Sequence, residues 1–167
     1  MTSLTLTNRA LLVSLTIRQW TARKFDKYES AAVANRHGTA ANVARVNKAL
    51  LPNADKLEAI TKQSTAIRTA YYTNTLPWTQ EGVNIIKSSA YIDFTNIIRP
   101  MMTDWWSKVE DFLRDYETLR MQAQHSLGSL YDDNDYPSVD QVRQKFDIGL
   151  NFAPVPDAAD WRVELGD

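Results

Sequence analysis

Thiol and imidazole side chains, which most often bind transition metals and act in nucleophilic catalysis, are scarce in this sequence. The chain has no cysteine and two histidines, His37 and His125, which stand far apart in the sequence. Thiolate ligands and disulfides are therefore excluded, and an imidazole-based metal site is not expected because the two histidines belong to different predicted elements. The sequence predicts no metal site and no cofactor.

An acidic run, Asp132 to Asp135, has the composition of a calcium-binding loop but not its spacing. Such a loop requires glycine at its sixth position and glutamate at its twelfth, whereas counting from Asp132 gives Pro137 and Arg143. We interpret the run as a solvated acidic turn that closes a long helix. Because the glycines are dispersed and no serine stands in a nucleophile elbow, we do not expect an enzyme.

Cations interleave with aromatic residues in one short segment, Arg18 to Tyr28. Nucleic-acid-binding proteins use this mixture, because cations neutralise phosphates and exposed rings stack on bases. The competing interpretation, which we favour, places Trp20 and Phe25 in the core and leaves the cations solvated. The candidate binding residues of this segment are Arg18, Trp20, Arg23, Lys24, Lys27 and Tyr28.

Charge is distributed unevenly along the chain, although the net charge is only -1. Residues 1–50 carry a net charge of +6, residues 51–99 carry +1, and residues 100–167 carry -8. The basic part could bind an anionic partner, or the two halves of the chain could attract each other within the fold. We favour internal pairing, because isolated surface charges contribute little on their own.

Two further tryptophans, Trp78 and Trp106, are candidates for a binding surface. On a helix, Trp105 and Trp106 point about 100° apart, so both cannot occupy one narrow apolar seam. The second ring either packs against the sheet, which we favour, or belongs to an exposed docking surface.

The elements that position these residues are visible in the period of the apolar side chains. Alternation predicts strands at Leu11–Ile17, Phe146–Phe152 and Trp161–Leu165, the last two forming a C-terminal hairpin. Together with the N-terminal strand, this hairpin would form a small antiparallel sheet.

The remaining segments have the period of helices. They are a short helix in Ala40–Leu51, long helices in Asn53–Asn74 and about Tyr91–Leu130, and a third, capped helix in Ser138–Phe146. The long helices share a seam spaced three and four residues apart, which favours an antiparallel helical hairpin joined by Thr75–Ala90. Homo-oligomerisation through the same seam is the rival explanation.

We therefore expect an α+β protein with one domain, residues 1–167. Its sheet elements would cover about 9–26 and 146–166, and its helical arm about 53–131. No apolar run is long enough to span a bilayer and no secretory signal is recognised at the N-terminus, so we expect no membrane association and a cytoplasmic location.

The segments Val13–Asp26 (VSLTIRQWTARKFD), Thr75–Trp78 (TLPW) and Pro154–Val163 (PVPDAADWRV) carry a resemblance that spans most of the chain. They resemble a family of small phage- and plasmid-encoded proteins catalogued as a domain of unknown function. The resemblance implies a virus-encoded protein in a bacterial host cytoplasm, whose relatives are often encoded near AAA-type ATPases and von Willebrand A-like proteins. It implies no catalytic residues.

Two functional hypotheses follow. The first is a non-enzymatic phage accessory protein that binds a host or phage protein through the helical hairpin and modulates a host defence or replication component. The alternative is a protein that binds single-stranded or duplex nucleic acid through the segment 18–28.

Overall fold

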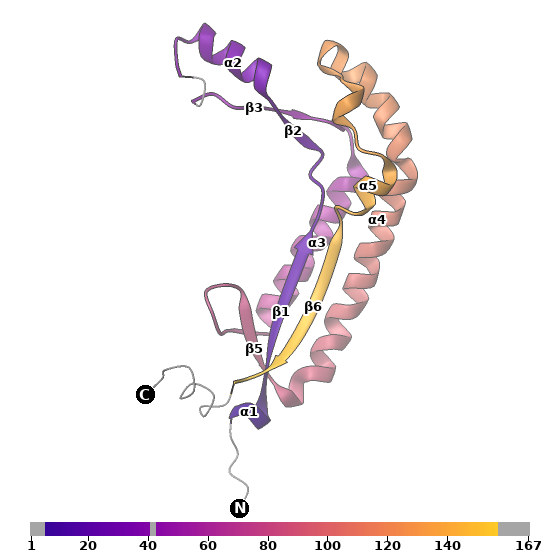
Figure 1. Cartoon of the computed structure of the whole chain (residues 1–167). Helices are drawn as coiled ribbons and strands as arrows, with labels where there is room; N and C mark the ends of the chain where they lie inside the picture. Colours follow the sequence, from indigo (N-terminus) through magenta and orange to yellow (C-terminus); the bar gives the residue numbers. More distant parts are fainter. Residues whose placement is uncertain (1–5, 41–42, 157–167) are drawn as a thin grey trace, which may run out of the picture. The chain divides into compact units, whose positions relative to one another are not determined.

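The computed structural model describes residues 6–40 and 43–156, which form two compact units (Figure 1). The first unit comprises Met1–Arg18, Ile60–Ser107 and Asp147–Asp167, and the second comprises Gln19–Ala59 and Lys108–Phe146. Two long helices, α3 (Asp55–Thr73) and α4 (Tyr91–Leu127), contribute residues to both units. The α+β class predicted from the sequence, with a long helix and a small antiparallel sheet, is confirmed.

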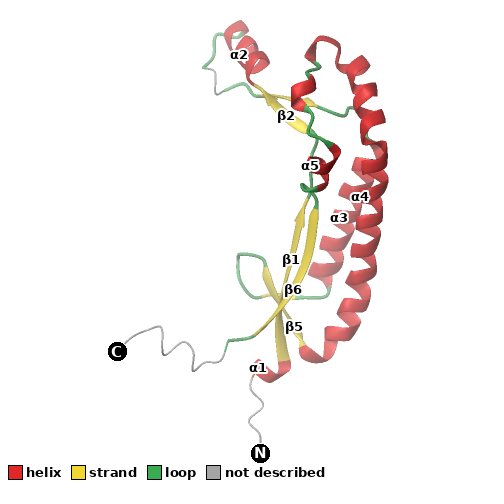
Figure 2. Cartoon of the chain, turned by 45° about the vertical axis from the view of Figure 1, so that its right-hand side comes forward, coloured by secondary structure: helices red, strands yellow, loops and turns green. Residues whose placement is uncertain are grey.

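The first unit contains a four-stranded antiparallel sheet in the order β4-β5-β1-β6. The strands are β1 (Ala10–Arg18), β4 (Leu76–Pro77), β5 (Val83–Lys87) and β6 (Asp147–Pro154), and the short helix α1 (Leu6–Arg9) precedes β1. β1 is central, with β5 on one side and β6 along its other side (Figure 2). The predicted strands at 11–17 and 146–152 are therefore present and pair with each other.

Alternation along β1 assigns its two faces. Val13 is buried, and Leu11 and Leu15 pack against the same core, in which Tyr71 from α3 and Ile98 from α4 take part. The rings of Tyr91 and Phe94, both from α4, also contact Phe152 of β6, with centroids 4.8 and 6.2 Å apart. The helices thus cover the face of the sheet that carries Leu11, Val13 and Leu15.

Within this unit, α3 and α4 make specific polar contacts as well as apolar ones. The indole Nε1–H of Trp105 donates to Ser64 Oγ at 2.8 Å, and Gln63 Nε2 donates to the carbonyl oxygen of Met101 at 3.0 Å. Trp105 and Ser64 are fully buried, so the predicted seam continues through both side chains. Trp106 is about one-third exposed and packs edge-on against Trp105, with ring centroids 4.9 Å apart.

The second unit is built on the other ends of the same helices. Phe112 and Tyr116 of α4 are buried, and Trp20 packs against them with ring centroids 6.4 and 5.9 Å away. Lys56 and Asp115 form an ion pair between α3 and α4 at 2.7 Å. The remaining elements are β2 (Arg23–Asp26), α2 (Lys27–Arg36), β3 (Val46–Ala49), α5 (Val139–Arg143) and the 3-10 turns Gly128–Leu130 and Asp133–Asp135.

Several predicted elements differ from the structure. The predicted helix in Ala40–Leu51 is wrong, because Val46–Ala49 is a strand that pairs antiparallel with β2. β2 therefore belongs to a separate two-stranded ribbon and does not extend the main sheet. The segment Thr75–Ala90 is more than a connection, since it supplies β4 and β5. The sequence analysis did not predict α2, whose first turn is capped by Asp26, which accepts a hydrogen bond from the backbone N–H of Glu29 at 3.0 Å.

The remaining predicted elements are accounted for. The third, capped helix is present but short, with the reciprocal hydrogen bonds of Ser138 and Gln141 in place. The predicted strand Trp161–Leu165 lies outside the described residues. The organisation of residues 1–167 as a single domain stays a prediction.

The Ser64 hydroxyl accepts a hydrogen bond from the fully buried indole N–H of Trp105, so removing this hydroxyl should destabilise the fold. Ser64→Ala should lower the free energy of unfolding by about 1–3 kcal/mol, because it leaves that N–H unsatisfied. Urea denaturation followed by tryptophan fluorescence measures the change. The double variant Ser64→Ala, Trp105→Phe should lose less than the sum of the two single losses, and strict additivity would contradict this role for the hydrogen bond.

Candidate binding surfaces

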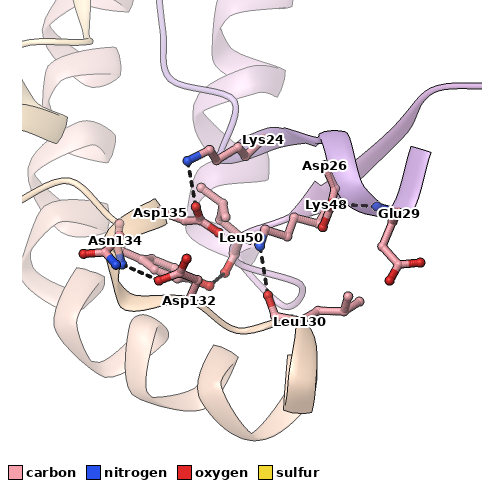
Figure 3. Close-up of polar contacts among 10 residues, drawn as sticks. Lys24, Asp26, Glu29, Lys48, Leu50, Leu130, Asp132, Asn134 and Asp135 are labelled. Carbon is pink, nitrogen blue, oxygen red and sulfur yellow. Dashed lines mark hydrogen bonds and ion pairs between the residues drawn. The ribbon is translucent and has the colours of Figure 1, made fainter. Parts of the chain in front are cut away.

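In the second unit, an ionic clasp formed by Lys24, Lys48 and Asp135 fastens the β2–β3 ribbon to the acidic turn (Figure 3). Lys24 and Lys48 are directly opposite each other in the ribbon, so their side chains share one face. Asp135 forms an ion pair with each ammonium group, with Nζ–Oδ distances of 2.7 Å to Lys24 and 2.5 Å to Lys48. Lys48 also donates to the carbonyl oxygen of Leu130 at 2.9 Å. The acidic run predicted to be a solvated turn therefore pairs with the basic N-terminal part of the chain.

The two lysines keep Asp135 ionised although its side chain is only 6% exposed. Burial by itself would raise the pKa of this carboxyl, but the hydrogen bonds and charges of Lys24 and Lys48 outweigh burial and hold the pKa below its ordinary value. In return, the hydrogen bond and charge of Asp135 raise the pKa of Lys24.

Tyrosines and one arginine reinforce the acidic turn. The buried hydroxyl of Tyr136 donates to the carbonyl oxygen of Leu50 at 2.6 Å, and burial raises the pKa of Tyr136 to about 12. The Arg120 guanidinium lies 5.4 Å from the centre of the Tyr136 ring and pairs with Asp133 at 2.9 Å. Hydrogen bonds from Tyr131 and Arg120 lower the pKa of Asp133.

The opposite face of the ribbon is left open to solvent. Because side chains alternate along a strand, Arg23 and Phe25 point away from the face that carries Lys24. Phe25 is 41% exposed, and the guanidinium of Arg45 lies 5.1 Å from the centre of its ring. Tyr28, in the first turn of α2, is 88% exposed. We refer to Arg23, Phe25, Lys27, Tyr28 and Arg45 as the basic-aromatic surface.

The structure separates the six candidate residues of the segment 18–28. Arg18 ends β1 in the first unit, whereas the other five belong to the second. Trp20 is packed against Phe112 and Tyr116, as the favoured interpretation predicted for it, and Lys24 is engaged by Asp135. The remaining three, Arg23, Lys27 and Tyr28, are exposed. Phe25, expected in the core, is partly exposed instead.

A second surface lies on the face of the first unit's sheet turned away from Val13. Leu76, Ile85, Leu12 and Ala153 form one row across all four strands, since each is the register partner of the next. Leu76 is 69% exposed. Trp78, two residues after Leu76, is also partly exposed, and its backbone N–H donates to the carbonyl oxygen of Val83 at 3.0 Å.

A pocket of about 350 Å³ opens beside this row, at the edge of the sheet. β5 pairs with β1 over its whole length but with β4 only at Leu76 and Pro77, so the end of β5 has no strand on that side within the described residues. The pocket fills this place, with Thr73–Leu76 on one wall and Ile85–Lys87 on the other. We refer to this pocket together with Leu76 and Trp78 as the edge pocket.

Buried hydrogen bonds hold the wall of the edge pocket in position. Asn84 Nδ2 donates to Thr75 Oγ1 at 2.7 Å, and Thr75 Oγ1 donates to the carbonyl oxygen of Tyr71 at 2.7 Å. The Tyr71 hydroxyl in turn donates to the carbonyl oxygen of Val13 at 2.8 Å. The pocket is therefore anchored to the core, because all of these polar groups are satisfied there.

The prediction from the sequence identified part of the basic-aromatic surface and part of the edge pocket. It named Trp78 without Leu76 and Ile85, although Ile85 and Ile86 lie in an apolar stretch between a glycine and a lysine that is typical of a short strand. It placed Arg45 in a helix and so did not relate it to Phe25. Trp106, the remaining candidate, lies on α4 and does not line the edge pocket.

Neither surface has the composition of a metal centre. Among the residues that the structure describes, no group of three or more histidine or acidic side chains is arranged to hold a metal ion. Over the same residues, none of the helices combines the length and the apolar character that crossing a membrane requires.

Comparison with protein-family models, with curated proteins and with solved structures finds no match.

Removing the carboxylate of the ionic clasp should loosen the ribbon. Asp135→Asn leaves Lys48 nearly buried without its counter-ion, so we expect a loss of about 1–3 kcal/mol, less than for a fully buried pair because Lys24 is half exposed. Native-state hydrogen exchange of the β2 and β3 amides measures it. Asp133→Asn, at a side chain that is 72% exposed, is the control and should change these amides little. Equal effects of the two variants would contradict the clasp.

The clasp also predicts a pH dependence with a definite sign. Because the pKa of Asp135 is lowered from 3.8, its contribution is present above pH 3.8 and is lost as the pH falls through the lower folded value. Because the pKa of Lys24 is raised from 10.5, its contribution is present below pH 10.5 and is lost as the pH rises through the higher folded value. The difference in amide protection between the native protein and Asp135→Asn should therefore shrink below pH 3.8. A difference that stays constant into strong acid would contradict this assignment.

Proposed function

We propose that this chain is a non-enzymatic accessory protein that binds an extended segment of a partner protein at the edge pocket. The observation that carries the proposal is the end of β5, which has no strand on its outer side among residues 6–40 and 43–156 and lies beside an apolar pocket. An extended peptide can add to such an edge, because backbone hydrogen bonds align it and a pocket accepts one of its side chains.

The geometry restricts where the peptide would lie. Pro77 occupies half of β4 and has no backbone N–H, so the outer side of β4 is a poor template for another strand. The peptide would instead lie beside Lys87, at the end of β5, and direct an apolar side chain onto Leu76 and Ile85. The exposed ammonium of Lys87 at the rim favours an acidic residue next to that apolar one.

The pocket and its surroundings suit a peptide side chain. Its volume of about 350 Å³ is at the lower end of ligand pockets, and its walls include Leu76, Ile85 and Ile86. Leu76 and Trp78 are large apolar side chains that water now covers in part, and burying them under a partner is favourable.

The resemblance to a phage- and plasmid-encoded family supports a host or phage protein as the partner, in the bacterial cytoplasm. Modulation of a host defence or replication component belongs to the same proposal. So does the pairing of α3 and α4 as one antiparallel hairpin, which is supported by the contacts of Ser64 with Trp105 and of Lys56 with Asp115. The helices would then act as the scaffold that holds the sheet.

The edge pocket makes a prediction that can be tested before the partner is identified. Random peptides selected by display on the immobilised protein should include apolar, acidic sequences that bind in fluorescence anisotropy titrations. Leu76→Glu should weaken their binding at least tenfold, because it places a charge at the apolar rim. Bound peptide should protect the amide of Lys87 from hydrogen exchange, since this N–H points away from β1, whereas the amide of Ile86 points toward β1. Met121→Glu is the matched control, since Met121 is 68% exposed and lies on α4 in the other unit, and it should leave binding unchanged.

Three outcomes would contradict the proposal. Selected peptides could bind Leu76→Glu as tightly as the native protein, or lose as much affinity with Met121→Glu. The third is a dimer in analytical ultracentrifugation that Leu76→Glu dissociates, which would assign the same surface to a second copy of the chain.

A further inference from the structure

The basic-aromatic surface of the second unit combines exposed rings and exposed cations from residues 23–28 with Arg45, which lies beside the ring of Phe25. Asp26 ends β2 and also caps α2, so Phe25 of the ribbon and Tyr28 of the helix are held close together in the chain. Tyr28 is 88% exposed, which is unusual for a large aromatic side chain in a globular protein. Packing within the described part of the second unit therefore does not explain this ring.

The charge around these rings is positive. Residues 19–50 contain six lysines and arginines and two acidic residues. Asp135 engages Lys24 and Lys48 on the inner face of the ribbon, and this leaves Arg23, Lys27 and Arg45 exposed on the basic-aromatic surface. Of the two acidic residues, Asp26 already accepts the hydrogen bond that caps α2.

We propose that this surface binds single-stranded nucleic acid. The cations contact phosphates, and the rings of Tyr28 and Phe25 stack on bases, which is the combination that single-strand-binding proteins use. Arg45, whose guanidinium lies 5.1 Å from the centre of the Phe25 ring, orients that ring and adds a planar group on which a further base stacks. This binding goes beyond peptide capture at the edge pocket and does not depend on it.

The exposed rings favour a single strand over a duplex as the ligand. In a duplex, the faces of the bases are already stacked on each other, so Tyr28 and Phe25 would find no partner without unstacking it. In a single strand, the bases are free to turn toward the protein. The cations alone would bind both polymers and would give affinity that depends on salt only.

The ionic clasp fixes the ribbon that carries part of the basic-aromatic surface. Lys24 and Lys48 are like charges opposite each other, and Asp135 holds both on the inner face. Arg23 and Phe25 are therefore presented on the outer face of a ribbon that is fixed on its other side. A fixed platform loses little conformational freedom when a ligand binds.

The test uses the full chain and a fluorescent oligothymidylate of roughly 16 nucleotides, with a duplex of the same length as competitor. Anisotropy titrations at low salt should show binding of the single strand at least tenfold tighter than of the duplex. Tyr28→Ala should weaken single-strand binding roughly five- to fiftyfold, and Tyr28→Phe should bind nearly as well as the native protein. Tyr72→Ala is the matched control and should leave single-strand binding unchanged, because Tyr72 is 60% exposed and lies on α3 in the first unit.

The contribution of the cations is measured separately, by the salt dependence of the binding affinity. For a single strand, each phosphate contact adds about 0.7 to the slope of log affinity against log salt, so replacing both Arg23 and Lys27 by glutamine should reduce the slope by about 1.4. Arg68→Gln, an exposed cation of α3, should leave the slope unchanged. Circular dichroism confirms that each variant is folded.

Each remaining outcome overturns the inference. Absence of binding to both polymers at low salt removes nucleic acid as the ligand. Duplex binding that equals single-strand binding, with no effect of Tyr28→Ala, removes the single-strand assignment and leaves a cation-only surface. Loss of binding with Tyr72→Ala or Arg68→Gln to the same degree places the contact elsewhere on the chain. None of these results bears on the edge pocket, whose peptides are measured separately.

Discussion

Burial of side chains along α3 and α4 is the constraint on which each of the two compact units depends. Ile60, Ser64 and Ile67 of α3, and Ile98, Trp105, Val109 and Phe112 of α4, are fully buried. Each unit builds its own core on a different length of these helices: the first adds the face of the sheet that carries Val13, and the second adds Trp20 and the acidic turn. A polar residue in such a seam is tolerated only when it is satisfied, as Ser64 is by the indole of Trp105.

Ion pairs hold the β2–β3 ribbon in place, whereas the sheet is held by burial of apolar side chains. A two-stranded ribbon is marginally stable by itself, because it has too little surface to bury. Here the clasp at Asp135 and the bond from Tyr136 to the Leu50 carbonyl fasten it to the turn after α4. Cations from the basic part of the chain, Lys24 and Lys48, thus pair with Asp135 from its acidic part, and the basic residues on the other side of the ribbon remain available for a ligand.

Elements with a long repeating period could be predicted from the sequence, whereas short strands that form only by pairing could not. The seam residues of α3 and α4 recur every three or four positions, and β1 and β6 alternate over many residues, so their types were predictable. In 43–50, the spacing of Val43, Val46 and Leu50 imitates a helix, whereas pairing with β2 makes 46–49 a strand. β4 has two residues and no period of its own, since it exists only through its register with Ile85 and Asn84.

The segment 18–28 could likewise be predicted only in part. The composition of the segment 18–28 indicated a mixture of cations and rings, but the distribution of its residues between core, clasp and surface depends on partners far along the chain. Lys24 is taken by Asp135, 111 positions away, and Trp20 by Phe112 and Tyr116. No local pattern distinguishes these side chains from Arg23 or Tyr28, because the distinction arises only when the chain is folded.

The proline in β4 bears on how this protein behaves when concentrated. Open sheet edges tend to join edge to edge with those of other molecules, and a growing stack of sheets is the usual result. Pro77 in a strand of two residues offers too few donors and too short a run to start such growth on that side. Growth of the sheet along β4 is therefore disfavoured, while the backbone of Lys87 at the end of β5 has no strand beside it on that side within the described residues.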